Sequence, residues 1–171
     1  MNTLNKKPKV LVTGANGYIG ENLLQKLTND GYEVVALVRN PETFQEREGI
    51  VVYPYQLDGD VCQDFFYGVS AIIHLATFTG KRNAETQKIE LNAIKHLLVA
   101  AKTGNVEKVV FVSSQSAQVD SPTFYGRDKW LLEQEVKKHD VIIVRPGLVY
   151  GGNKECALFV IDLKIKLMNY Y

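Results

Sequence analysis

Residues 10–20 read V-L-V-T-G-A-N-G-Y-I-G, and this stretch decides the fold class. Its first four residues lean apolar, which is typical of a parallel strand buried on both faces. A helical pattern of apolar residues then opens at Ile19 and continues to Leu27. The stretch therefore predicts a strand, a tight turn and the start of a helix.

Three glycines lie in and after this turn: Gly14, Gly17 and Gly20. Gly14 lets the chain turn in a conformation that other residues resist, Gly17 lets a ligand approach the main chain, and Gly20 lets the helix pack closely on the strand. The amides at a helix start favour an anion. The turn thus predicts a site for a dinucleotide pyrophosphate; the alternative is a loop whose glycines serve only turning and packing.

The composition is that of an ordinary globular protein of 171 residues, long enough for one domain. A net charge of +1 gives no electrostatic reason to expect a nucleic acid or a membrane surface as partner. An apolar run of about 18 residues, as a membrane-spanning helix needs, is absent from the sequence. Cys62 and Cys156 lack metal-ligand spacing, so we expect no metal site and reduced thiols in a cytoplasmic enzyme.

The remaining chain alternates strand and helix patterns. Strands are predicted at 32–38, 50–53, 69–76, 106–113 and 141–144, long helices at 84–102 and 124–138, and short helices within 41–48 and 60–68. Such alternation predicts a doubly wound parallel sheet in a three-layer α/β/α Rossmann fold, with strand order 3-2-1-4-5-6 by analogy with that fold. We assign residues 1–152 to this domain and 153–171 to the start of a truncated or reduced substrate-binding region.

Arg39 follows the second predicted strand, about 20 residues beyond the glycine turn. An acidic residue at this place binds the adenosine ribose hydroxyls, whereas an arginine accommodates the 2′-phosphate of NADP. Arg39 therefore favours NADP over NAD as the cofactor, unless it is simply a solvated loop residue.

Polar residues at the end of the fourth predicted strand allow two interpretations. His74 lies within an apolar run, which favours a core histidine over a catalytic one. Lys81 and Arg82 follow at the edge where open α/β sheets bind ligands, so either could meet a phosphate-bearing substrate or be solvated.

Tyr125 and Lys129 form a Y-x-x-x-K pattern after the fifth predicted strand. Residues four apart share one face of a helix, so both side chains would project together. The Lys129 ammonium would then lower the pKa of the Tyr125 phenol, whose reference value is about 10. The pair therefore predicts a proton switch.

Several of these motifs resemble the short-chain dehydrogenase/reductase superfamily. T-G-x-x-G-x-x-G at 13–20 resembles its signature, and G-Y-I-G at 17–20 its extended, epimerase/dehydratase-like branch. I-H-L-A at 73–76 and R-P-G-x-V-Y-G at 145–151 resemble further family segments, so the resemblance spans residues 9–152. It implies an enzyme that transfers a hydride between NADP or NAD and a secondary alcohol or ketone.

The resemblance also implies roles for individual residues. Tyr125 would exchange the proton of a substrate hydroxyl, Lys129 would hold the nicotinamide ribose, and Ser114, in preference to Ser113, would bond the reacting oxygen. The adenine contact falls either on Leu57 or on Asp58, and Asn92 either steadies the site or lies on the surface. The implied cofactor-binding residues are Gly14, Asn16, Gly17, Tyr18, Ile19, Gly20, Arg39, Leu57, Asp58, Leu75, Ala76, Thr77, Asn92, Lys129 and Pro146.

Two departures from the family pattern bear on the site. The stretch from Ser114 to Tyr125 is shorter than in most relatives, and Asp128 replaces a serine often found before the lysine. The substrate expected by resemblance is a nucleotide sugar or a related small molecule, and a homodimer through the 84–102 and 124–138 helices is implied. The alternative functions are a non-catalytic NADP-binding regulatory module and an inactive cofactor-domain fragment.

Overall fold

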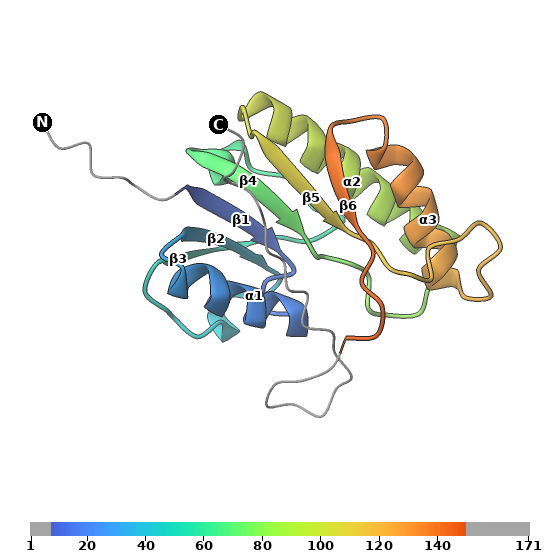
Figure 1. The fold of residues 1–171 in the computed structure, drawn as a ribbon, viewed down its shortest axis with the longest axis horizontal. Helices are drawn as coiled ribbons and strands as arrows, with labels where there is room; N and C mark the ends of the chain where they lie inside the picture. Colours follow the sequence, from blue (N-terminus) through green and yellow to red (C-terminus); the bar gives the residue numbers. More distant parts are fainter. Residues whose placement is uncertain (1–7, 150–171) are drawn as a thin grey trace, which may run out of the picture.

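Six parallel strands form one sheet in the computed structural model, which describes residues 8–149 (Figure 1). The strands are β1 Lys9–Thr13, β2 Glu33–Val38, β3 Ile50–Pro54, β4 Val69–His74, β5 Lys108–Val112 and β6 Val141–Val144. Their order is β3-β2-β1-β4-β5-β6, and every neighbouring pair is parallel. The predicted sheet is confirmed, and its switch point lies between β1 and β4.

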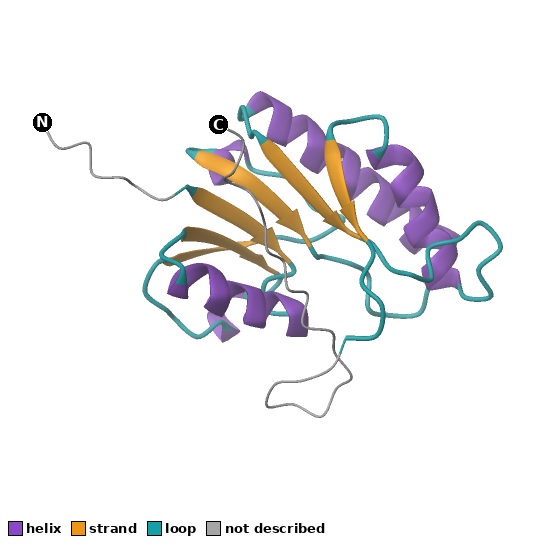
Figure 2. Cartoon of the chain, viewed as in Figure 1, coloured by secondary structure: helices purple, strands orange, loops and turns teal. Residues whose placement is uncertain are grey.

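The described part of the chain has three α-helices: α1 Tyr18–Asn29, α2 Ala84–Thr103 and α3 Phe124–Val136. Helix α1 lies on one face of the sheet, and α2 and α3 lie side by side on the other (Figure 2). None of the helices within residues 8–149 is both long and apolar enough to cross a membrane.

Alternate residues of β1 supply two separate cores. Val10 and Val12 are buried with Leu24 of α1, whereas Leu11 is buried with Leu97 of α2. Successive side chains of a strand point to opposite faces, so a strand covered on both sides needs an uninterrupted apolar run. This is why the first four residues of the 10–20 stretch show no polar alternation.

The two short helices predicted within 41–48 and 60–68 are single 3-10 turns, Pro41–Thr43 and Gln63–Phe66. Phe66 is fully buried and anchors the second turn against the core. Gly68 follows with a φ of 69°, a conformation that favours glycine and ends the turn before β4. Val61 and Phe65 also pack against this core, so these apolar residues of 60–68 face inward at a short 3-10 turn rather than on an amphipathic helix.

Helix α3 buries charged residues as well as apolar ones. Leu132 and Val136 are buried, whereas Leu131 is 37% exposed. Asp128 and Lys129 are buried as well. The buried face of this helix is therefore partly charged.

The segments 150–152 of the predicted first domain and 153–171, with Cys156, lie outside the described residues.

Candidate cofactor and active site

The glycine turn holds the end of β1 tightly against the segment after β4. Gly14 has a φ of 66°, and a Cβ atom there would lie 2.8 Å from the backbone nitrogen of Ala76. A Cβ atom on Gly20 would collide with the carbonyl oxygen of Gly14. Both positions therefore require glycine, one for the turn and one for packing of α1.

Gly17 is the N-cap residue of α1, with φ −74° and ψ 166°. Because glycine has no side chain, it leaves the first amides of this 12-residue helix without a capping group from that position. Its own amide donates to the carbonyl of Gly14 at 3.0 Å, which closes the turn. The helix start thus presents amide donors and the positive end of its dipole to an anion.

A cavity of about 470 Å³ opens over this turn at the carboxyl ends of the strands. Its lining comes from the glycine turn, from 37–39, 55–58 and 75–80, and from Ile89 of α2. Nine of the residues predicted to bind the cofactor line it: Gly14, Asn16, Gly17, Arg39, Leu57, Asp58, Leu75, Ala76 and Thr77. Leu57 and Asp58 both line it, so the choice between them for an adenine contact stays open.

The other predicted cofactor residues lie outside this lining. Gly20 is buried and Tyr18 and Ile19 are half-buried in the first turn of α1. Asn92 is exposed on α2. Pro146 accepts a hydrogen bond through its carbonyl from the Gln115 amide at 3.0 Å. Their contacts with a cofactor remain predictions.

Thr13 and His74 join the ends of β1 and β4 beneath the cavity. The Thr13 hydroxyl oxygen accepts from the amides of Leu75 and Ala76 at 3.2 and 3.1 Å and lies 2.8 Å from His74 Nδ1. Its proton therefore goes to Nδ1, which leaves the imidazole proton on Nε2. Burial, with the Lys129 charge as a smaller cause, lowers the pKa of His74 to about 3. His74 is a neutral core histidine, as predicted.

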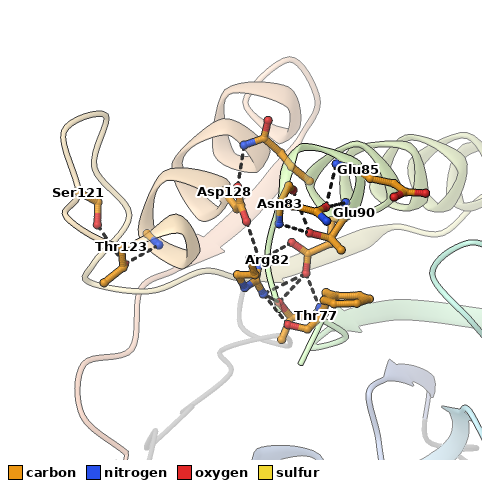
Figure 3. Close-up of polar contacts among 12 residues, drawn as sticks. Thr77, Arg82, Asn83, Glu85, Glu90, Ser121, Thr123 and Asp128 are labelled. Carbon is orange, nitrogen blue, oxygen red and sulfur yellow. Dashed lines mark hydrogen bonds and ion pairs between the residues drawn. The ribbon is translucent and has the colours of Figure 1, made fainter. Parts of the chain in front are cut away.

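Arg82, immediately before α2, lies at the centre of a polar cluster (Figure 3). Its Nη1 atom donates to Glu90 Oε2 at 2.9 Å and to Asp128 Oδ2 at 2.8 Å. Its Nη2 atom donates to the Thr77 hydroxyl at 2.9 Å and to the Phe78 carbonyl at 2.7 Å. This guanidinium is committed to the protein rather than free for a substrate phosphate, while Lys81 is exposed.

The two carboxylates of this cluster are almost completely buried. Glu90 Oε1 accepts from the Thr77 hydroxyl at 2.6 Å and from the Phe78 amide at 2.5 Å. Asp128 Oδ1 accepts from the Gln87 side-chain amide at 2.6 Å. Burial pushes the pKa of Glu90 upward, but the hydrogen bonds and charge of Arg82 outweigh it and the pKa is lowered. Glu90 is therefore a charged residue inside the protein.

Tyr125 and Lys129 share one face of α3, as predicted, on the side of this cluster. The Arg82 guanidinium carbon lies 4.9 Å from the centre of the Tyr125 ring, and Lys129 Nζ lies 5.8 Å from it. Lys129 Nζ donates to the Val112 carbonyl at 3.2 Å and lies 5.0 Å from the centre of the Phe111 ring. Burial lowers the pKa of Lys129 to about 8, although Glu90 acts against this.

The expectation that Lys129 lowers the pKa of Tyr125 was wrong. Burial raises the pKa of the Tyr125 phenol above its usual value, and Glu90 adds to this. The groups that pull the pKa down are the Arg82 charge and a hydrogen bond with Ser114. Lys129 Nζ donates to the Val112 carbonyl and lies 5.8 Å from the ring centre, farther than the Arg82 guanidinium carbon at 4.9 Å.

The two serines after β5 have different surroundings. Ser114 acts on the Tyr125 phenol and lowers its pKa, and its hydroxyl oxygen lies 2.9 Å from that of Ser116. Ser113 is buried and donates to Glu133 Oε1 at 2.6 Å. Ser114 is therefore the serine beside the phenol, in line with the predicted preference.

Sequence reasoning missed Glu90 as a residue of the site. It lies on the buried face of α2 with Ala93, Ile94 and Leu97, where a carboxylate needs a partner. The signal in the sequence was a charged residue, Glu90, on the apolar face of a predicted helix. The departure noted at Asp128 has the same explanation, because that side chain binds Arg82.

A doubly wound sheet with a glycine turn, an open helix N-terminus and a cavity at the switch point defines a dinucleotide-binding domain of the Rossmann class. The sequence model of the NAD dependent epimerase/dehydratase family matches residues 10–161. The chain belongs to this family. Among the residues described, no group of three or more His, Cys, Asp or Glu side chains is arranged to hold a metal ion.

The relatives include two reductases and a solved complex with NAD. The chain is 34% identical to ketoreductase adrE of Penicillium roqueforti over 89% of its length, and 30% identical to dTDP-4-dehydro-6-deoxy-D-allose reductase of a Streptomyces species over 83%. It covers 52% and 56% of these two proteins, so it spans about half of each. The structure of MoeE5 with UDP-glucuronic acid and NAD matches with a TM-score of 0.65 and 29% identity, over 84% of this chain and 56% of that one.

Proposed function

We propose that this chain is the cofactor-binding part of an NAD(P)-dependent oxidoreductase that acts on a secondary alcohol or ketone. The observation that carries the proposal is the grouping of Ser114, after β5, with Tyr125 and Lys129 in the first half of α3. Arg82 joins this group to the cavity, because it lies over the Tyr125 ring and binds Thr77 and Phe78 of the cavity lining. Function is inferred from this site rather than from the fold alone.

The residues around the cavity fit a dinucleotide. The amides at the start of α1 would bind the pyrophosphate, since Gly17 presents no side chain that would cover them. Arg39, exposed at the end of β2, would bind a 2′-phosphate and so favour NADP over NAD. The bound nicotinamide would supply the hydride chemistry.

The raised pKa of Tyr125 suits a proton donor. The phenol is protonated at neutral pH, so it can protonate a carbonyl oxygen as that oxygen gains negative charge. Ser114 would donate a hydrogen bond to the same oxygen, and Lys129 would hold the nicotinamide ribose. This arrangement favours the reduction of a ketone over the oxidation of an alcohol.

The substrate we propose is a nucleotide sugar or a related small ketone, with isomerisation as an alternative outcome of the same hydride chemistry. The support is that MoeE5 is solved with a UDP-sugar and that the named relatives include a sugar reductase and a ketoreductase. We further propose a cytoplasmic location and a homodimer through α2 and α3, which expose Val99 and Leu131. A rival proposal is a non-catalytic NADP-binding module, favoured by Arg39 at the end of β2.

Calorimetric titration of the chain with NADP⁺ and NAD⁺ tests the cofactor site. We expect NADP⁺ to bind more tightly, and Arg39→Ala to weaken NADP⁺ by about tenfold while changing NAD⁺ little. Arg47→Ala is a matched control, because Arg47 contacts the Phe44 ring instead of lining the cavity. Absence of binding to both dinucleotides contradicts the proposal.

Turnover of NADPH with dTDP-4-keto and UDP-4-keto sugars and with aromatic ketones tests the enzyme. We expect Tyr125→Phe to abolish turnover while cofactor binding stays unchanged. Binding of NADP⁺ with no turnover of any of these ketones by the wild-type chain favours the regulatory module instead.

A further inference from the structure

We propose that Arg82, held between Glu90 and Asp128, is a positioning residue that fixes the Tyr125 ring and supplies the positive charge facing its phenol. The inference rests on the proposed function in taking Tyr125 as the proton donor. It adds that Arg82 supplies the positive charge that stabilises the phenolate, a role that the Y-x-x-x-K pattern predicted for Lys129.

The guanidinium is held too firmly to serve as a flexible substrate ligand. Its side chain is 11% exposed, and its two terminal nitrogens bind Glu90, Asp128, Thr77 and the Phe78 carbonyl. Two carboxylates on two different helices fix its plane, and planar forked contacts of this kind give geometric precision. The consequence is a cation with one defined position against the ring.

The same contacts connect the cavity with the proton donor. Thr77 and Phe78 line the cavity and bind both Arg82 and Glu90. Figure 3 shows this cluster extending from the loop after β4, through α2, to Asp128 on α3. Tyr125 and Lys129 lie on the same helix as Asp128. The cluster therefore joins the cavity lining to the helix that carries the predicted proton donor.

Four charged groups lie around Tyr125. The cations Arg82 and Lys129 lie near its ring, and the anions Glu90 and Asp128 pair with Arg82. Ser114 adds a hydrogen bond from the segment after β5. The Arg82 charge stabilises the phenolate, and the Glu90 charge destabilises it. Neutralising Arg82 should therefore raise the pKa of Tyr125, and neutralising Glu90 should lower it.

This opposition makes a sharp test, because Arg82→Gln and Glu90→Gln break the same ion pair. We would label the protein with ¹³Cζ-tyrosine, assign Tyr125 with Tyr125→Phe, and measure the ionised fraction at pH 10.5 by NMR. The expected result is a decrease of about threefold in the ratio of phenolate to phenol in Arg82→Gln and an increase of about threefold in Glu90→Gln. A role limited to stability would shift both variants the same way or neither.

Arg127→Gln is the matched control. Arg127 stands on the same helix and stacks 4.7 Å from the centre of the neighbouring Phe124 ring, so its removal should leave the Tyr125 signal unchanged. The proposal is overturned if the ionisation of Tyr125 changes in the same direction in both test variants, or if it changes no more than in the control. If Arg82→Gln does not fold, Glu90→Gln decides alone: an increase supports the proposal, and no increase overturns it. The titration needs neither cofactor nor substrate, so its result is independent of whether hydride transfer is found.

Discussion

Arg145 donates through Nε to Glu133 Oε1 at 2.7 Å, and a second hydrogen bond joins Arg145 Nη2 to Glu133 Oε2. Glu133 is fully buried in α3, whereas Arg145 begins the segment after β6 and is 43% exposed. The pair therefore ties the helix that carries Tyr125 and Lys129 to the first residue beyond the sheet. Ser113 completes the contact by donating to the same carboxylate.

Arg145→Ala should lower the free energy of unfolding by about 1–3 kcal/mol, because it leaves a buried carboxylate short of its main partner. Urea unfolding measures this. Lys138→Ala is the control, since Lys138 pairs with Glu135 at the surface and such pairs contribute less than about 1 kcal/mol. Equal losses in the two variants would show that the Glu133 pair is no stronger than a surface pair.

The free energy of unfolding of the wild-type chain should rise between pH 8 and pH 10, and Lys129→Met should lack this rise. The folded-state pKa of Lys129 is about 8, below its unfolded value near 10.4, so between these values the unfolded chain binds more protons. Stability of the wild-type chain relative to Lys129→Met should therefore increase by about 1–3 kcal/mol from pH 8 to pH 10. Urea unfolding of both proteins at each pH gives the difference; a difference that stays constant contradicts the prediction.

His74 should stay neutral under mildly acidic conditions. Its folded-state pKa of about 3 lies below the ordinary value of 6.5, so its contribution to stability is lost as the pH falls from 6.5 towards 3. Long-range ¹H–¹⁵N NMR spectra should show a neutral imidazole with the proton on Nε2 down to about pH 4.5. The exposed His96 and His139 provide resonances for comparison in the same sample. Protonation of His74 above pH 5 would contradict this.

Gly126→Ala should destabilise the segment between Ser114 and Tyr125. A Cβ atom on Gly126 would collide with the Ser121 hydroxyl and the Ser116 carbonyl. We expect a loss of about 2–4 kcal/mol in urea unfolding. Gly59→Ala is the control, because its Cβ would sit at an ordinary 3.5 Å from the Gln56 carbonyl. A loss in Gly126→Ala no greater than in Gly59→Ala would mean that the segment moves aside freely.

Sequence predicted the sheet well because its physical determinants are local. Apolar runs, the glycine turn and the two long helical patterns predicted the strands and helices, and analogy with the Rossmann fold supplied the strand order and the edge at which the cavity opens. The pairing of Tyr125 with Lys129 followed from their spacing along one helix, whereas the preference for Ser114 came from the family resemblance. The patterns and the spacing depend on residues close together in the chain.

The charges around Tyr125 could not be predicted in the same way. Arg82 and Asp128 are 46 positions apart, and only folding places them 2.8 Å from each other. The same holds for the direction of Lys129, which depends on the Val112 carbonyl of a neighbouring strand. The pKa of the phenol is the sum of these long-range terms and of burial, so a motif alone gave it the wrong sign.

The two edge strands of the sheet, β3 and β6, differ in how readily they can pair with a strand of another polypeptide. β3 ends in Pro54, which cannot donate a backbone hydrogen bond, whereas β6 consists of Val141, Ile142, Ile143 and Val144, with Ile142 49% exposed. An edge made only of β-branched residues, without lysine or proline, is a template for strand addition. In concentrated solution, β6 is therefore where aggregation by strand addition should begin, as distinct from the proposed dimer through α2 and α3, and Ile142→Lys is the substitution to make for crystallisation.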